Sequence, residues 1–311
     1  MGGGDWNRDF YKARQEERVK SNTDAFDYHR AVAAAPSHEQ KIHELMDPKG
    51  ITREARDSLE HPDSLPIAVI LDITGSQKDA PKIFQGALPQ LMNTLIDNKL
   101  IEHPQVLAGC IGDANDGKGP LQVGQFESDI RIDDTFTRMW LQGGGGGGGK
   151  ESYELAFYFF ARKVSFDSLE KRGKKGYLYV TADERFYDTV SRVEVERWFG
   201  DGLEADLPTT NIIEEVKAKW NVFIVIPQHT DNGRDRGLQA YWRDVFGSDH
   251  VLILEEEKLV CELIALNTAV HEGTTTLAES TLPASIVQAV AQARGESVSA
   301  RAGTSAATAR L

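Results

Sequence analysis

The chain has 311 residues, of which 40% are hydrophobic, and this length supports one large core in one or two domains. Its 48 acidic residues outnumber 35 Lys and Arg, and the net charge of -13 disfavours a nucleic-acid backbone as partner and favours cations or basic surfaces. The two cysteines, Cys110 and Cys261, lie in apolar stretches, which favours buried, reduced thiols and leaves no disulfide framework or zinc set.

Residues 1–65 form a charged segment with three prolines and no strand-like run, so we expect an arm of helical pieces joined by loops. Its opening residues lack the apolar core of a signal peptide, and no run approaches the ~18 apolar residues of a membrane span. We therefore expect an intracellular, cytoplasmic protein with no membrane partner. We expect the aromatic side chains of the arm to pack it against the domain, and the alternative is that the arm is a partner-binding segment. These aromatic residues are Trp6, Phe10, Tyr11, Phe26 and Tyr28.

A continuously apolar run from Pro66 to Asp72 predicts a strand buried on both faces of a parallel sheet. Helical spacing follows over residues 80–98, where Pro89 is expected to bend the helix. Residues 104–113 and 120–128 are strand-like and flank a turn-rich segment, which predicts an antiparallel hairpin whose second member is an edge strand.

The rest of the domain alternates between helical and strand-like segments. A short helix near 130–141 is followed by seven glycines, Gly143 to Gly149, and by an apolar helix over 151–164 whose aromatic residues are expected in the core. Further buried strands are predicted at 175–183, 221–227 and 250–255, with helices near 192–199, 208–219, 237–246 and 257–270. This order predicts an α/β fold, a doubly wound, mostly parallel sheet with one antiparallel edge strand and helices on both faces.

The predicted domain covers residues 66–272. From residue 273 to 311 the chain is rich in Thr, Ser and Ala, a composition that cannot sustain a core, so we expect a flexible tail interrupted by a short helix around residues 286–293.

The candidate site begins where the first buried strand ends, at Asp72-Ile73-Thr74-Gly75-Ser76. Ligands of open α/β sheets bind at the carboxyl ends of the strands, and Gly75 permits a tight path that brings the oxygens of Asp72, Thr74 and Ser76 together. Such an all-oxygen set suits a hard cation such as Mg²⁺. In the alternative without a ligand, Asp72 caps the next helix, and the hydroxyls of Thr74 and Ser76 form hydrogen bonds with backbone groups of the turn.

Three further carboxylates are expected at the same edge of the sheet. Asp183 follows the strand that ends at Thr181, Glu151 follows the glycine tract, and Asp113 follows the second strand. Each has an ordinary alternative, as a turn or hairpin residue, and the tract itself is either a ligand-bearing loop or a plain surface loop. It lacks the Gly-Lys-Ser/Thr ending of a phosphate-binding loop. His229, Asp231 and Asp235 are interpreted as a polar loop because no nucleophile motif accompanies them.

The arrangement resembles the von Willebrand factor A family over roughly residues 66–270. The family's metal-ion-dependent adhesion site combines Asp-x-Ser-x-Ser after the first strand with a Thr from a second loop and an Asp after the fourth strand. Asp72, Thr74, Ser76 and Asp183 match this pattern, with Thr74 in place of the first Ser. The second loop offers no obvious Thr, and Glu151 is the candidate there, directly or through water.

The resemblance implies a non-enzymatic adaptor or assembly protein that uses Mg²⁺ or Mn²⁺ to bind an acidic residue of a partner protein. Two alternatives remain open. Asp72 followed by Thr74 also looks like the aspartyl-phosphate loop of the haloacid dehalogenase group, an Mg²⁺-dependent phosphoryl-transfer enzyme. Alternatively, the metal site has lapsed and the fold serves only as an assembly surface.

Overall fold

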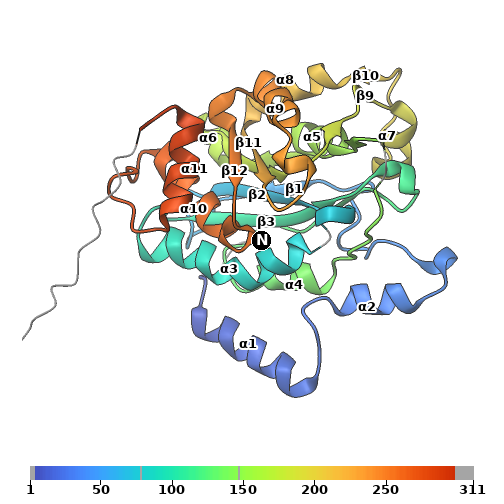
Figure 1. Ribbon diagram of the computed structural model, residues 1–311. Coiled ribbons are helices and arrows are strands. Elements are labelled where there is room, and N and C mark those ends of the chain that lie inside the picture. The colour runs from blue at the N-terminus through green and yellow to red at the C-terminus, as the bar shows by residue number, and fades with distance from the viewer. Residues whose placement is uncertain (1–3, 78, 146–147, 298–311) are drawn as a thin grey trace, which may run out of the picture.

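The computed structural model describes residues 4–77, 79–145 and 148–297, apart from the side chain of Ser76. Its centre is a six-stranded sheet in the order β12-β11-β7-β2-β3-β4, in which all neighbours are parallel except β3 and β4 (Figure 1). Helices cover both faces of the sheet, so the predicted doubly wound α/β fold with one antiparallel edge strand is confirmed.

Five of the six sheet strands follow the predicted apolar runs closely, because each of these runs is buried between two helical layers, whereas β4 is shorter than the edge strand predicted over residues 120–128. All eight residues of β2 and all eight of β3 are buried. The strands are β2 (Leu65–Asp72), β3 (Pro104–Ile111), β4 (Leu121–Val123), β7 (Gly176–Thr181), β11 (Trp220–Pro227) and β12 (Val251–Leu254).

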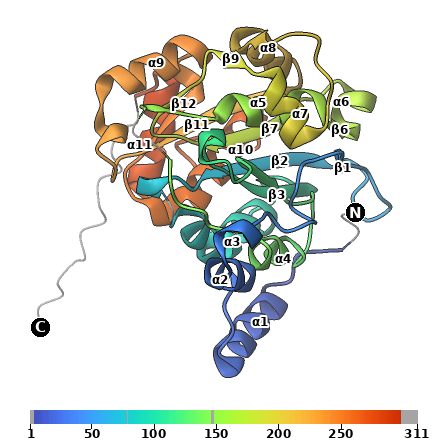
Figure 2. The same cartoon turned by 90° about the vertical axis from the view of Figure 1, so that its right-hand side faces the viewer.

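Two hydrophobic layers lie on opposite faces of the sheet, and alternate residues of β2 enter each of them: Ile67 and Val69 one, Ala68 and Ile70 the other. Both cysteines are free and buried. Residues of α3 (Ala80–Asp97), α4 (Ile132–Thr137), α10 (Val260–Glu272) and α11 (Ala284–Arg294) build the first layer. Residues of α5 (Tyr153–Arg162), α7 (Arg192–Phe199), α8 (Thr209–Lys219) and α9 (Arg236–Phe246) build the second, as Figure 2 shows from the side.

Short elements connect these layers. The expectation of no strand before residue 66 is wrong, because β1 (Arg53–Ala55) pairs in parallel with β6 (Val164–Phe166). Three residues with two charged side chains carry no apolar pattern, so only the partner strand defines β1. The other short elements are β5 (Lys150–Glu151), β8 (Arg185–Phe186), β9 (Thr189–Val190), β10 (Leu207–Pro208), α6 (Asp167–Arg172), η1 (Ser37–Glu39), η2 (Gly75–Gln77), η3 (Ala114–Asp116), η4 (Asn232–Arg234), η5 (Ser248–His250) and η6 (Glu257–Leu259).

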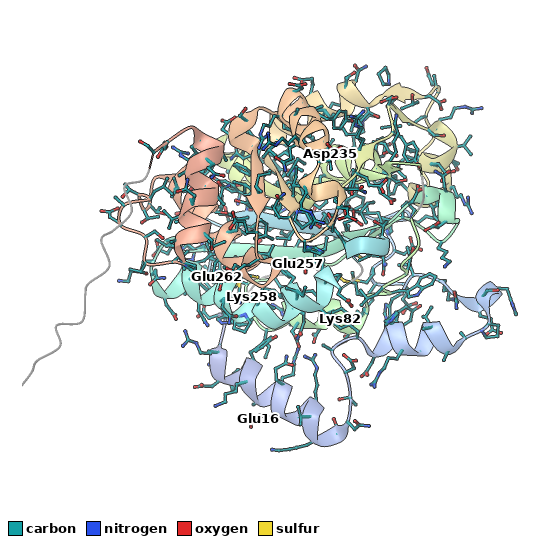
Figure 3. All side chains as sticks on the ribbon, in the orientation of Figure 1. Glu16, Lys82, Asp235, Glu257, Lys258 and Glu262 are labelled. Atoms are coloured by element: carbon teal, nitrogen blue, oxygen red, sulfur yellow. The ribbon has the colours of Figure 1, made fainter. Side chains whose placement is uncertain are left out.

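The N-terminal arm contains α1 (Arg8–Ser21) and α2 (Asp27–Ala34), which lie outside the α3 and α4 layer (Figures 1 and 2). The hydroxyl of Tyr11 donates to the Gln85 carbonyl at 2.8 Å, and the buried ring of Phe26 meets Phe136 edge-on. These aromatic residues therefore fasten the arm as expected, whereas Phe10 is 65% exposed. Figure 3 shows Glu16 of α1 pointing away from the domain.

The arm also reaches the outer side of β4. The Val123 amide donates to the Met46 carbonyl at 2.9 Å, and the Arg53 guanidinium donates to the Val123 carbonyl at 3.0 Å. Val123, on the edge strand, therefore has both backbone groups paired with the arm.

At the other end of the chain, α11 confirms the short helix expected around residues 286–293, and six of its residues are buried against the domain. Residues 298–311 of the predicted tail lie outside the described residues. None of the described helices has the length and apolar character needed to span a membrane.

Candidate metal centre

The candidate centre lies at the topological switch point of the sheet. β2 and β7 are parallel neighbours, but the chain continues from β2 to β3 on one side and from β7 to β11 on the other, so a switch point lies between their carboxyl ends. Asp72 is the last residue of β2, and Asp183 comes two residues after β7 ends at Thr181. The predicted meeting of these loops is thus observed.

The carboxylate of Asp72 is fully buried and accepts hydrogen bonds on both oxygens. Its Oδ1 accepts from the backbone amide of Thr74 at 2.7 Å and from the Thr74 hydroxyl at 2.6 Å. Its Oδ2 accepts from the hydroxyl of Tyr153. Burial, followed by the nearby charge of Asp183, raises the pKa of Asp72 to about 7.

Gln77 bridges the two predicted aspartates. Its side-chain amide donates to Asp72 Oδ2 at 3.2 Å and to Asp183 Oδ1 at 2.9 Å, and only 2% of the residue is exposed. A neutral donor between two buried carboxylates reduces their repulsion, so Gln77 fills part of the role that a bound cation would take.

Glu151 lies in β5, which pairs with β8 beside the β7 loop. The residue is 2% exposed, and its Oε2 is buried without a hydrogen-bond partner in the part of the chain that the structure describes. Burial is the main cause that raises the pKa of Glu151 to about 9, and the other causes are four nearby carboxylates, those of Asp72, Asp113, Glu184 and Asp116. Glu184, next to Asp183, also has a buried Oε2 to which no described residue donates a hydrogen bond.

The glycine tract reaches this edge, as predicted for the second loop. The Gly144 carbonyl accepts from the Gly75 amide at 2.7 Å, and the Gly145 amide donates to Asp116 at 2.8 Å. A Cβ atom on Gly145 would lie 2.5 Å from Glu151 Oε1 and 2.6 Å from Thr74 Cβ, so only glycine fits between these two residues. Residues 146–147 lie outside the described part of the chain.

Asp113 fastens the neighbouring loops together. Its Oδ1 accepts from the Ser152 hydroxyl at 3.0 Å and from the Asn115 amide at 3.1 Å, and its Oδ2 accepts from the Tyr187 hydroxyl at 3.1 Å. These internal donors engage both oxygens, so in this structure Asp113 holds the start of η3 against the second loop.

The remaining sequence candidates lie outside this cluster or outside the described atoms. Ser76 belongs to η2, but its side chain is outside what the structure describes. The imidazole of His229 meets Glu257 at 3.1 Å, and Asp235 caps α9 by accepting from the Gly237 amide (Figure 3 labels Asp235 and Glu257).

Sequence reasoning missed residues that complete the site: Gln77, Tyr153, Thr181 and Tyr187. The backbone amide of Asp72 donates to the Thr181 hydroxyl at 2.8 Å, which ties the ends of β2 and β7 together. Tyr153 was expected only in the core, where its ring does meet Trp242 edge-on. Its position directly after Glu151 and Ser152, at the start of a helix, was the available signal.

The donor chemistry suits a hard cation only in part. The Thr74 hydroxyl and the buried oxygens of Glu151 and Glu184, which accept from no described residue, are oxygen ligands of the type that Mg²⁺ prefers. In the described residues, however, no three Asp, Glu, His or Cys side chains are grouped so that they could hold a metal ion. A cation would therefore depend on hydroxyl ligands and on a turn of the Gln77 amide.

No family model and no curated protein sequence matches this chain. One similar solved structure is the pilus adhesin SpaC from Lactobacillus rhamnosus GG in its open conformation, with a TM-score of 0.48 and 10% identity over 72% of this chain and 31% of that one. Another is proximal thread matrix protein 1 from the mussel byssus, with a TM-score of 0.44 and 12% identity over 66% and 47%. This chain thus spans about a third of the length of the adhesin and about half of the length of the matrix protein.

Proposed function

We propose that the chain is a non-enzymatic protein-binding module of the von Willebrand factor A type, in which Mg²⁺ or Mn²⁺ links the site to a carboxylate of a partner protein. The observation that carries the proposal is the set of carboxylates at the switch point, where Glu151 and Glu184 each keep a buried oxygen without a hydrogen-bond partner among the described residues. A divalent cation would supply the positive charge that this cluster needs.

Asp72, Thr74 and Asp183 would hold the cation, with Glu151 from the second loop as a further oxygen ligand and Ser76 as the third residue of the first motif. The cation's contribution is an open coordination position that attracts a carboxylate. The chain's own residues fix the ligands: Thr181 holds the end of β2, and Tyr153 orients the Asp72 carboxylate.

Calorimetric titration of Mg²⁺ and Mn²⁺ into the full chain tests the metal step. We expect binding that Asp72→Asn abolishes and that the control Asp97→Asn leaves unchanged, because Asp97 is the exposed last residue of α3. Capture of a partner with and without EDTA then tests the binding role. Metal binding that survives Asp72→Asn contradicts the proposal.

The phosphoryl-transfer alternative requires an Asp72 oxygen that is open to a substrate. Here Asp72 is fully buried and donors engage both of its oxygens, which disfavours a nucleophilic role. Mg²⁺-dependent phosphatase turnover, lost in Asp72→Asn, would overturn the non-enzymatic proposal.

A second candidate is a scaffold of the same type whose metal site has lapsed. The Gln77 bridge favours it, because an amide that already pairs with both aspartates reduces the need for a cation. Absence of any Mg²⁺ or Mn²⁺ binding by the unmodified chain would select this candidate.

A further inference from the structure

A pocket of about 260 Å³ lies between the arm and the edge of the sheet, away from the candidate metal centre. We name it the arginine pocket, after its lining residues Arg53, Arg131 and Arg138. Because β4 runs antiparallel to its neighbour, Gly124 at the pocket lies beyond the end of β4 that points away from the carboxyl ends of the parallel strands. The pocket is therefore independent of the cluster around Asp72.

Two of the three guanidinium groups have no acidic partner among the residues that the structure describes. Arg131 pairs with Asp129 and Glu127 at 2.9 and 3.1 Å. Arg53 instead donates to the carbonyls of Leu45 and Val123, and its buried Nε has no acceptor among the described residues. Arg138 is half-buried and makes no ion pair or side-chain hydrogen bond within the described chain.

Burying a guanidinium group without an acidic partner costs folding free energy. Two such groups in one pocket are unexpected in a chain with a net charge of -13, where acidic side chains outnumber basic ones. Burial lowers the pKa of Arg53, which reflects the same cost. The two acidic lining residues do not offset them, because Asp134 pairs with Arg14 at 2.6 Å and Glu127 pairs with Arg131 at 3.1 Å. The pocket thus has positive charge available to a ligand.

We propose that the arginine pocket binds the phosphoryl group of a small organic phosphate. Two uncompensated guanidinium groups match a dianion with three oxygens better than a monovalent carboxylate. Thr135 lines the same pocket and carries a hydroxyl as a neutral donor, while the lining residues Leu45 and Met46 offer apolar surface to the organic portion.

Calorimetry of the full chain with phenyl phosphate, inorganic phosphate and benzoate, all in EDTA, tests this proposal. Phenyl phosphate is expected to bind more tightly than either of the others, because only it offers both a dianion and an apolar group. Arg138→Gln should weaken its binding by about tenfold or more, the usual effect of losing one charge-assisted hydrogen bond. Arg192→Gln, which changes an exposed arginine at the start of α7, should leave it unchanged.

Absence of phenyl phosphate binding overturns the proposal, as does equal binding by Arg138→Gln in a chain with unchanged circular dichroism. Tighter binding of benzoate would show that the pocket is a carboxylate site and would refute the phosphate assignment. Asp72→Asn should retain phenyl phosphate binding, so failure of the metal proposal and failure of this one are distinguishable.

Discussion

Replacing Gln77 with Ala removes the amide that donates to Asp72 at 3.2 Å and to Asp183 at 2.9 Å. Each of these two hydrogen bonds to a charged group contributes about 1.5–3 kcal/mol to stability. The loss is offset in part because the unfolded Gln77 side chain no longer gives up about 1.5–2 kcal/mol of conformational entropy on folding. In EDTA we therefore expect Gln77→Ala to lower the free energy of unfolding by about 2–4 kcal/mol. For a chain of this length, this corresponds to a fall in Tm of roughly 3–6 °C.

Mg²⁺ should reverse most of this loss. In the unmodified chain a cation must displace the Gln77 amide, whereas in Gln77→Ala this amide no longer occupies the space beside Asp72 Oδ2 and Asp183 Oδ1. Mg²⁺ should therefore raise the Tm of the variant more than that of the unmodified chain.

Thermal unfolding of both proteins in EDTA and in Mg²⁺ measures these changes. The control is Gln239→Ala, which removes a glutamine that donates to the Gly233 carbonyl at 2.9 Å, outside the carboxylate cluster. Its response to Mg²⁺ should equal that of the unmodified chain. If Gln77→Ala binds Mg²⁺ more weakly than the unmodified chain, Gln77 is a ligand through its carbonyl oxygen and the reasoning is refuted.

Three further predictions concern pH, Tyr153 and the arm. The pKa values of about 7 for Asp72 and about 9 for Glu151 lie above the ~4 of unfolded carboxyl groups, so the folded state binds protons more tightly. The stability that these two protonated groups contribute is complete below about pH 4 and is lost as the pH rises to about 9. Urea midpoints in EDTA should thus be lower at pH 9 than at pH 6, and a midpoint independent of pH would contradict these pKa shifts. Tyr153→Phe keeps the buried ring but removes the hydroxyl that donates to Asp72. Urea titrations should show a free energy of unfolding lower by about 1–3 kcal/mol, and an unchanged midpoint would contradict this role of Tyr153. Phe26→Ala removes a buried ring that meets Phe136, and should increase hydrogen exchange in α2 while β2 stays protected; uniform exchange across both would show that the arm and the domain unfold together.

The sheet was predictable because its strands are buried on both faces. Each apolar run, such as Leu65–Asp72, carries its own signal, and the helices between the runs fix the parallel direction. β1 was not predictable, since the segment Arg53–Ala55 becomes a strand only through its pairing with Val164–Phe166. Its polar side chains give no periodic signal.

Only site residues that lie at or just after the end of a strand were predictable from the sequence. Asp72 and Asp183 meet because neighbouring parallel strands end at one edge, which the element order implies. The Gln77 bridge to Asp183 joins residues 106 positions apart, and the bond from Tyr153 to Asp72 joins residues 81 apart. Contacts of this kind depend on side-chain packing across two loops, and spacing within a single segment does not reveal them.

The pairing of the arm with Val123 also bears on how copies of the chain behave in concentrated solution. An edge strand with free amide and carbonyl groups is a template for the strands of another molecule. Here Met46 and Arg53 engage both backbone groups of Val123, so the arm shields part of the short edge strand β4. Removal of residues 1–52 would free the Val123 amide, and the protein's solubility would then depend on an exposed apolar edge. The arm thus leaves less of this edge open to pairing with another molecule.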